Sequence, residues 1–170
     1  MKTRVQVVVL FFLFVFPIQS FCQEAWVEAL KNESWLSPLN RLVLQQSDKA
    51  EVESILGKPE QFEYPTADFI EYYNVPNGRV TATFSTAACH SLDGRSVGAY
   101  TLEEVDLEPA KPRSFSSLNL ITEWFILTKD SDAPVVKTYT NVKNGLAIEV
   151  QNGIVTSVNF SVPENKSCMP

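Results

Sequence analysis

A cysteine and the only histidine of the chain stand side by side, at Cys89 and His90. A thiol beside an imidazole could act as a nucleophile with its base. Neighbouring residues of an extended chain point to opposite sides, however, which disfavours that arrangement. One histidine and the available thiols also fall short of the four ligands of a structural zinc site. The chain carries no nucleophile elbow, phosphate loop or dinucleotide fingerprint either, so we predict no catalytic residue, no metal site and no cofactor.

The cysteine count points to a different use of Cys89. If Cys22 is removed with a leader, Cys89 and Cys168 remain, and an even number of cysteines in an exported chain predicts a disulfide. This bond would join the end of the first predicted hairpin to the C-terminal end. It would close a loop of about 80 residues and stabilise by roughly 4 kcal/mol in the chain-entropy description. Two free or buried thiols are the alternative.

The leader itself is predicted from the first 22 residues, which have the layout of a secretory signal peptide. Lys2 and Arg4 form a basic start, and residues 7–18 are almost wholly apolar. That run is shorter than the roughly 20 residues that span a bilayer, so we expect no membrane span after signal removal; an uncleaved anchor is the alternative. We predict a secreted or periplasmic protein. Lipid attachment at Cys22 is not expected, because bulky Phe21 stands where lipoprotein processing requires a small residue.

Acidic residues dominate the charge, with 20 Asp and Glu against 14 Lys and Arg and a net charge of −6. A protein with this net negative charge is repelled by the phosphate backbone, so no nucleic-acid partner is expected. Three carboxylates, Glu104, Asp106 and Glu108, alternate along one predicted strand and therefore share a face. A row of this kind is typical of a solvated sheet face, but it could also hold calcium or a basic partner. A calcium-stabilised domain, or a secreted hydrolase using this strand, is therefore the alternative to the function predicted below.

Tyrosines gather near the first predicted hairpin. Tyr72 and Tyr73 are adjacent and must face opposite sides of a strand, so at least one of them is expected to be exposed or to meet another element. With Tyr100 they are the candidate partner-binding residues, because exposed tyrosine anchors protein interfaces well. Core and cross-strand packing is the alternative explanation.

The elements that must position these residues have local signals of their own. A helix is predicted from Asp48 to Leu56, with Glu51 placed for a capping box, Gly57 for a left-handed end and Pro59 to stop it. Further helices are predicted at residues 26–36 and 119–124, strands at residues 69–75, 79–86, 100–107, 135–142, 146–150 and 154–162, and a loop at residues 89–98.

Two segments, residues 72–78 and 139–145, share the pattern Tyr-x-Asn-Val-x-Asn-Gly. Asn-Gly favours a tight hairpin turn, and the repeated turn with its flanking strands suggests a duplicated unit. We predict an α+β fold in which short helices pack on one face of antiparallel sheet, built from two tandem helix-hairpin units. The predicted organisation is a signal peptide (1–22), an N-terminal unit (23–109), a linker (110–117) and a shorter C-terminal unit (118–170).

The run from Asp48 to Pro59, ending in Leu-Gly-Lys-Pro before a tyrosine-rich hairpin, resembles the small outer-membrane lipoproteins of the SmpA/OmlA type. It is also similar to beta-lactamase inhibitor proteins, which are built from two tandem copies of such a unit. The resemblance covers residues 44–107 and, more loosely, residues 119–162, but the acylated cysteine of the lipoproteins has no equivalent. It implies binding or assembly without catalysis. We therefore predict an exported, non-enzymatic protein-binding or envelope-assembly module whose partner is an envelope or extracellular protein.

Overall fold

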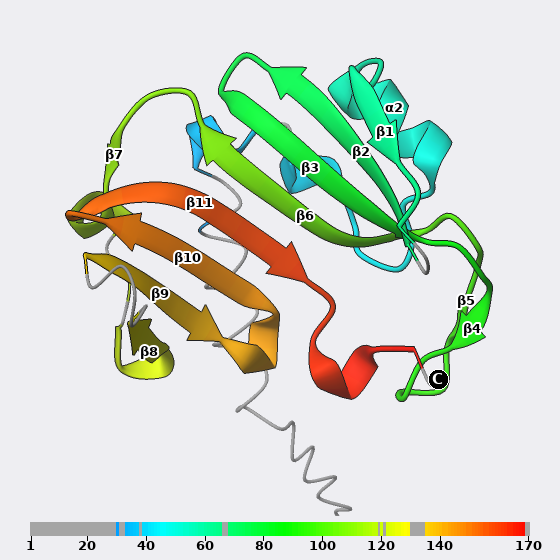
Figure 1. Ribbon diagram of the computed structural model, residues 1–170. Coiled ribbons are helices and arrows are strands. Elements are labelled where there is room, and N and C mark those ends of the chain that lie inside the picture. The colour runs from blue at the N-terminus through cyan, green and yellow to red at the C-terminus, as the bar shows by residue number, and fades with distance from the viewer. Residues whose placement is uncertain are drawn as a thin grey trace, which may run out of the picture.

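The computed structural model describes residues 30, 33–37, 39–65, 68–118, 120, 122–129 and 135–168. The predicted signal peptide, Cys22 and most of the helix predicted at residues 26–36 lie outside these residues. The largest element of the described chain is one antiparallel sheet in the order β1-β2-β3-β6-β11-β10-β9-β8, with β7 also paired to β11 (Figure 1). The strands are β1 (Gln61–Glu63), β2 (Asp68–Val75), β3 (Gly78–Ser85), β6 (Leu102–Pro109), β7 (Arg113–Ser114), β8 (Ile126–Lys129), β9 (Val136–Asn141), β10 (Leu146–Gln151) and β11 (Ile154–Ser161). A separate hairpin joins β4 (Cys89–His90) to β5 (Ser96–Val97), inside the segment predicted as a loop.

The predicted α+β class with two helix-hairpin units is wrong, because the protein is mainly antiparallel β-sheet. The first predicted helix of the repeat is present as α2 (Lys49–Leu56), where the Asp48 side chain accepts a hydrogen bond from the Glu51 amide. At its predicted counterpart, residues 119–124, the described residues form no α-helix: Thr122–Trp124 form a single 3-10 turn, and β8 begins at Ile126. Branched and aromatic residues there favour an extended chain, which the sheet uses by pairing β8 with β9.

The strand order is symmetric about the pair β6 and β11. On one side β6 continues into β3 and β2, and on the other β11 continues into β10 and β9, so the sheet runs without a break through both halves. The two hairpins have the same register, since Asn74 lies opposite Arg79 and Asn141 opposite Leu146. They present these positions differently, however: Arg79 is exposed and Leu146 is buried.

The glycines of the two hairpin corners have matching surroundings. A Cβ atom on Gly78 would overlap the carbonyl oxygen of Glu108, and one on Gly145 would overlap that of Ser161. Both carbonyls end the third strand of their half, so each corner packs its backbone directly on that strand. Only a residue without a side chain permits this approach.

One face of the sheet carries the hydrophobic core. Alternate residues of the central strands point into it, and α2 and the turns at Ser34–Leu36 and Leu39–Arg41 cover it. In Figure 1 these covering segments lie behind the strands. The core side chains of the central strands are Phe69, Tyr73, Val80, Ala82, Phe84, Leu102, Val105, Leu107, Leu146, Ile148, Val150, Val155, Val158 and Phe160.

Candidate functional site

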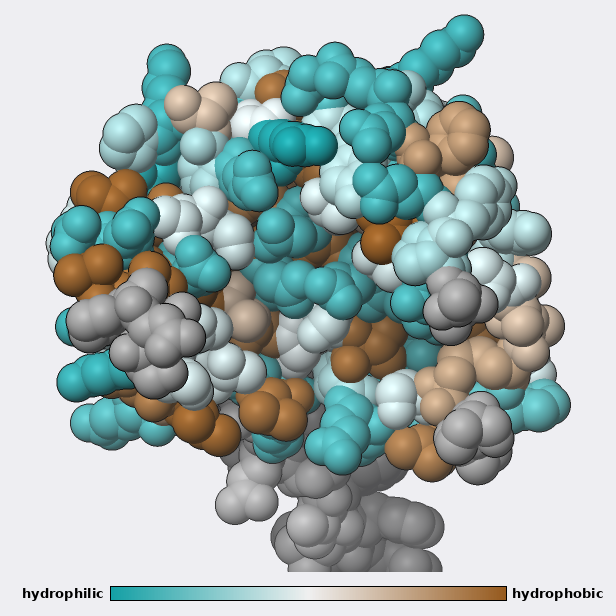
Figure 2. Space-filling view, in the orientation of Figure 1, coloured by the Kyte–Doolittle hydropathy of each residue, from teal (hydrophilic) through white to brown (hydrophobic). Residues whose placement is uncertain are grey.

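The second face of the sheet, which we call the open face, faces the viewer in Figure 1. Its side chains alternate with those of the core, and most are half-buried and polar. The open face consists of Tyr72 on β2, Arg79, Thr81 and Thr83 on β3, Glu104, Asp106 and Glu108 on β6, Ser157 and Asn159 on β11, and Ala147 and Glu149 on β10. Figure 2 shows mainly hydrophilic side chains over its centre, with hydrophobic ones gathered toward the rims.

The acidic row predicted from the sequence lies at the centre of the open face. Asp106 stands between Thr81 on β3 and Asn159 on β11, its two cross-strand neighbours. The Asn159 amide donates a hydrogen bond to the Glu104 carboxylate, while one oxygen of Asp106, Oδ1, is buried and has no hydrogen-bond partner among the described residues. The strand therefore holds a carboxylate that is only partly satisfied.

Burial and, to a smaller extent, the neighbouring carboxylates of Glu108, Glu104 and Glu149 raise the pKa of Asp106 to about 6, while a hydrogen bond with Ser157 acts to lower it. Glu149 lies on β10, so the prediction from the sequence, which named only Glu104, Asp106 and Glu108, identified part of this cluster. Its own carboxylate accepts a hydrogen bond from the Thr156 hydroxyl, 2.8 Å away. The open face thus gathers the carboxylates of Glu104, Asp106 and Glu108 from β6 and of Glu149 from β10.

The described residues contain no group of three or more His, Cys, Asp or Glu side chains that could hold a metal ion. This finding covers Glu104, Asp106 and Glu108, the residues of the calcium alternative.

The three predicted partner-binding tyrosines do not come together. Tyr73 is buried in the core, where its hydroxyl donates to the Glu71 carboxylate. Tyr72 lies on the open face, with the Arg79 guanidinium 5.0 Å from its ring centroid. Tyr100 is 46% exposed at a different place, in the connection between β5 and β6. Only Tyr72 belongs to the open face.

Tyr100 instead joins an aromatic cluster at the β1 edge, around buried Phe69; the sequence had placed Tyr64, Phe69 and Tyr100 near the first hairpin but had not included Phe62. Its ring meets Phe69 edge-on at 6.3 Å, and Tyr64 and Phe62 pack against Phe69 at 4.5 and 6.2 Å. Phe62 and Tyr64 are 62% and 66% exposed, which is unusual for aromatic side chains. The alternating spacing of Phe62 and Tyr64 was the available signal.

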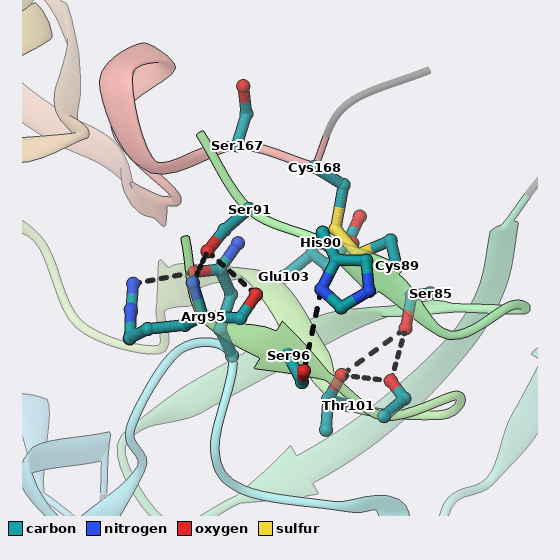
Figure 3. The surroundings of a disulfide bond; sticks show 12 residues. Ser85, Cys89, His90, Ser91, Arg95, Ser96, Thr101, Glu103, Ser167 and Cys168 are labelled. Atoms are coloured by element: carbon teal, nitrogen blue, oxygen red, sulfur yellow. Dashed lines mark hydrogen bonds between the residues drawn. A yellow bond between two sulfur atoms is a disulfide. The ribbon is translucent and has the colours of Figure 1, made fainter. Parts of the chain in front are cut away.

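The predicted disulfide between Cys89 and Cys168 is present and ties the β4–β5 hairpin to the C-terminal segment (Figure 3). Because the Cys89 sulfur is held in this bond, it is not a nucleophile for His90. The imidazole is exposed and lies 3.4 Å from the Ser96 hydroxyl. On the inner side, a Glu103 carboxylate oxygen lies 3.8 Å from the Cys168 sulfur, and burial followed by the nearby Asp68 carboxylate raises the pKa of Glu103.

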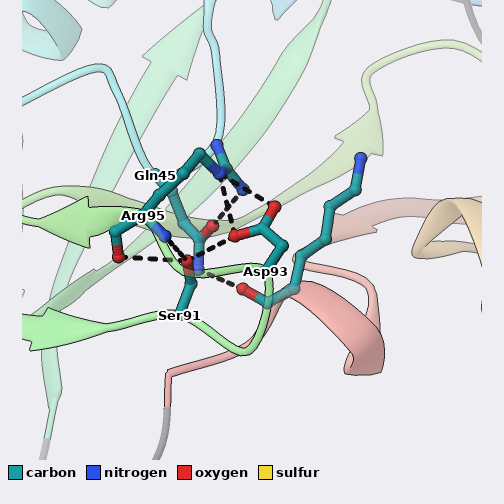
Figure 4. A network of polar contacts seen from close by, with 5 residues as sticks. Gln45, Ser91, Asp93 and Arg95 are labelled. Carbon is teal, nitrogen blue, oxygen red and sulfur yellow. Dashed lines mark hydrogen bonds and ion pairs between the residues drawn. The ribbon is translucent and has the colours of Figure 1, made fainter.

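A polar network beside the disulfide holds the same hairpin (Figure 4). The Arg95 guanidinium donates to both oxygens of Asp93, at 3.0 and 2.9 Å, and to the side-chain oxygen of Gln45 at 2.9 Å. Gln45 in turn donates to the Lys166 carbonyl, and buried Ser91 receives the Arg95 amide. Hydrogen bonds from Arg95 and then Ser91 lower the pKa of Asp93 to about 2. The network links three segments that are far apart in the sequence, those of Gln45, Arg95 and Lys166.

A half-buried ion pair lies on the core side of β2. Glu71 is fully buried, and its Oε1 atom is 2.8 Å from the ammonium of Lys49, which is partly exposed. The hydrogen bond with Glu71 raises the pKa of Lys49, and burial followed by the Glu71 contact raises that of Tyr73. These three residues fasten the first turn of α2 to the sheet.

Comparisons with known proteins yield no relative: no family model, no curated protein and no solved structure matches the chain. Within the described residues, no helix combines the length and the apolar character needed to cross a bilayer. A disulfide is typical of oxidising compartments outside the cytosol, which is consistent with export.

Proposed function

We propose that the protein is an exported, non-enzymatic binding module that holds an envelope or extracellular protein against the open face of its sheet. The observation that carries this proposal is a sheet face that no described element covers: α2 and the N-terminal turns pack on the opposite side, and the open face presents half-buried polar side chains across β3, β6 and β11. The resemblance of residues 44–107 to SmpA/OmlA-type lipoproteins supports the proposal by analogy only.

The charge of the open face sets the chemistry of the partner. Four carboxylates face outward, on Glu104, Asp106, Glu108 and Glu149, against one guanidinium on Arg79. A partner with Lys or Arg side chains at its contact surface would neutralise them and gain both specificity and association rate. A cationic surface close to Asp106 would also offset the charge of its carboxylate, whose Oδ1 atom is buried and has no hydrogen-bond partner among the described residues. We therefore propose a cationic protein surface as the partner.

A matched pair of charge reversals tests this proposal. The partner is captured on immobilised protein from the envelope and extracellular fractions, purified, and its Kd is measured for the wild type, Glu149→Lys and Glu51→Lys. Glu149 lies on the open face and Glu51 on the exposed side of α2, so both variants change the net charge equally.

We expect Glu149→Lys to weaken binding by roughly tenfold or more and Glu51→Lys to leave the Kd within about twofold. Equal affinities for all three proteins would contradict the open face as the binding surface, as would failure to capture any protein.

A further inference from the structure

A groove of about 400 Å³ lies where β2, β3 and β6 end at the first hairpin corner. Three exposed polar side chains line it and are direct cross-strand neighbours: Asn74 lies opposite Arg79, and Arg79 opposite Glu108. All three sit on the outward side of the sheet, at the margin of the open face.

Arg79 and Glu108 carry opposite charges at facing positions, yet they form no ion pair in the described part of the chain. The reason is the stacking of the Arg79 guanidinium on Tyr72, a residue of β2 on the side of β3 away from Glu108. Stacking over an aromatic ring holds the guanidinium in place and leaves its N–H donors available. The groove thus has a preset cation on one side and an unpaired carboxylate on the other.

The floor of the groove is backbone. Gly78 approaches the Glu108 carbonyl too closely for any side chain, and the Ala110 amide donates to the Asn77 carbonyl at 2.8 Å. These contacts fix the end of β6 against the hairpin corner, so the separation of the two charges is set by the sheet.

We propose that this groove binds a small dipolar ligand, with a carboxylate on the fork of Arg79 and an ammonium group against Glu108. A guanidinium receives a carboxylate through two parallel hydrogen bonds, which gives geometric selectivity as well as attraction. A free amino acid and a short peptide with both ends free share this chemistry. The site goes beyond the proposed protein partner and does not require it.

The second hairpin corner provides an internal control. A groove of about 250 Å³ lies there between Gly145 and the end of β11. Leu146 stands at the position equivalent to Arg79, and the described residues that line this groove include no Lys or Arg. Ligands that recognise shape alone would use both corners, whereas a dipolar ligand is selective for the first.

Titrations followed in proton-nitrogen correlation spectra of the whole protein test the proposal. The probes are glycine, β-alanine, 4-aminobutyrate and triglycine, with acetate as the monopolar control, and the proteins are the wild type, Arg79→Lys and Glu108→Gln. The amino acid series varies the distance between the charges, and triglycine separates a peptide source from a free amino acid.

We expect saturable shifts at the amides of Gly78, Arg79 and Ala110 with at least one dipolar probe, and none at Gly145 or Leu146. Arg79→Lys should weaken binding by roughly tenfold, since a lysine keeps the charge and loses the fork. Glu108→Gln should abolish the preference for the dipolar probe over acetate. The proposal is overturned if no probe gives a saturable shift, if both corners respond alike, or if Arg79→Lys binds like the wild type.

Discussion

At the residue scale, the buried carboxylate of Asp106 lowers the stability of the folded protein near neutral pH. Its pKa is raised to about 6 in the folded protein, compared with an ordinary value near 4, so the native state binds the extra proton between these two pH values. The free energy of unfolding therefore falls as pH rises from about 4 to about 6. A carboxylate kept in such a place is typical of a functional site, although structural clusters can produce the same shift.

Asp106→Asn should remove this pH dependence, because the amide has the same shape and buries no charge. We expect the variant to be more stable than the wild type by about 1 kcal/mol at pH 7, a value reduced from the full shift because the group is partly solvated. Urea unfolding at pH 4 and pH 7 would measure it. If the open face binds a cationic partner, the same variant should bind more weakly; equal stability at both pH values relative to the wild type would refute the account of Asp106.

Lys49 and Glu71 make a different residue-scale prediction. Lys49→Met removes the cation beside a fully buried carboxylate, and we expect a loss of about 3 kcal/mol in the free energy of unfolding. Adding Glu71→Gln to this variant should restore part of the loss, since the buried group is then neutral. Denaturant unfolding of the two single variants and the double variant gives the coupling energy, and strictly additive losses would show that the pair does not interact.

At the scale of elements, the hairpin corners depend on close backbone approach rather than on turn propensity alone. Gly145 has a left-handed φ of 62° and no room for a Cβ atom, whereas Gly153, in the turn between β10 and β11, has a φ of 79° and nothing within 4 Å. Substitution of Gly153 therefore tests backbone strain alone, whereas substitution of Gly145 tests strain together with steric overlap.

Gly153→Ala should lower the free energy of unfolding by about 1 kcal/mol, the strain of a left-handed alanine. Gly145→Ala should lower it by roughly 3 kcal/mol or more, because the backbone of Ser161 must also move. Thermal melts of both variants measure the difference. Equal losses would mean that β11 yields freely at this corner, against the rigid packing described for it.

Among the elements, α2 and the hairpins were predictable because their signals are local. The Asp48 cap and Gly57 lie within one turn of the helix they bound, and the Asn-Gly corners are read from adjacent residues. The absent second helix was not predictable in this way. Residues 122–129 have only weak preferences for either a helix or an extended strand. The extended conformation is selected when β8 pairs with β9.

For the molecule as a whole, the disulfide and the polar network both link the β4–β5 hairpin to the C-terminal segment, and the network adds the segment of Gln45. Cys89–Cys168 spans 79 residues, and the hydrogen bonds of Gln45 reach both Arg95 and the Lys166 carbonyl. The β4–β5 hairpin lies outside the main sheet, so these links are what attach it to the rest.

Replacement of Cys89 and Cys168 by serine should lower the free energy of unfolding by roughly 2–4 kcal/mol, mainly through greater freedom of the unfolded chain. Denaturant unfolding of the variant, and of the wild type with and without reductant, would measure this. Hydrogen exchange should become faster at the Leu92 amide, which donates to the Ser167 carbonyl, by a larger factor than in β3 and β6, where only the loss of global stability acts. Uniformly faster exchange would contradict a local role for the bond.

The candidate site divides along the same lines as the fold. Alternation along one strand identified Glu104, Asp106 and Glu108 as sharing a face, and the cysteine count identified the disulfide. The addition of Glu149 to the acidic cluster required β10 and β6 to lie on either side of β11. The Arg79 groove required the three strands at one corner.

The sequence by itself determined the features whose causes lie within a few residues: the capped helix α2, the Asn-Gly corners and the alternation of polar and apolar side chains. Only the tertiary structure decided which side of each strand meets the core. The residue that follows the shared seven-residue pattern is therefore exposed in the first half, at Arg79, and buried in the second, at Leu146. The reason is that a strand has two faces, and the partner strands and covering segments far along the chain determine which of them is removed from water.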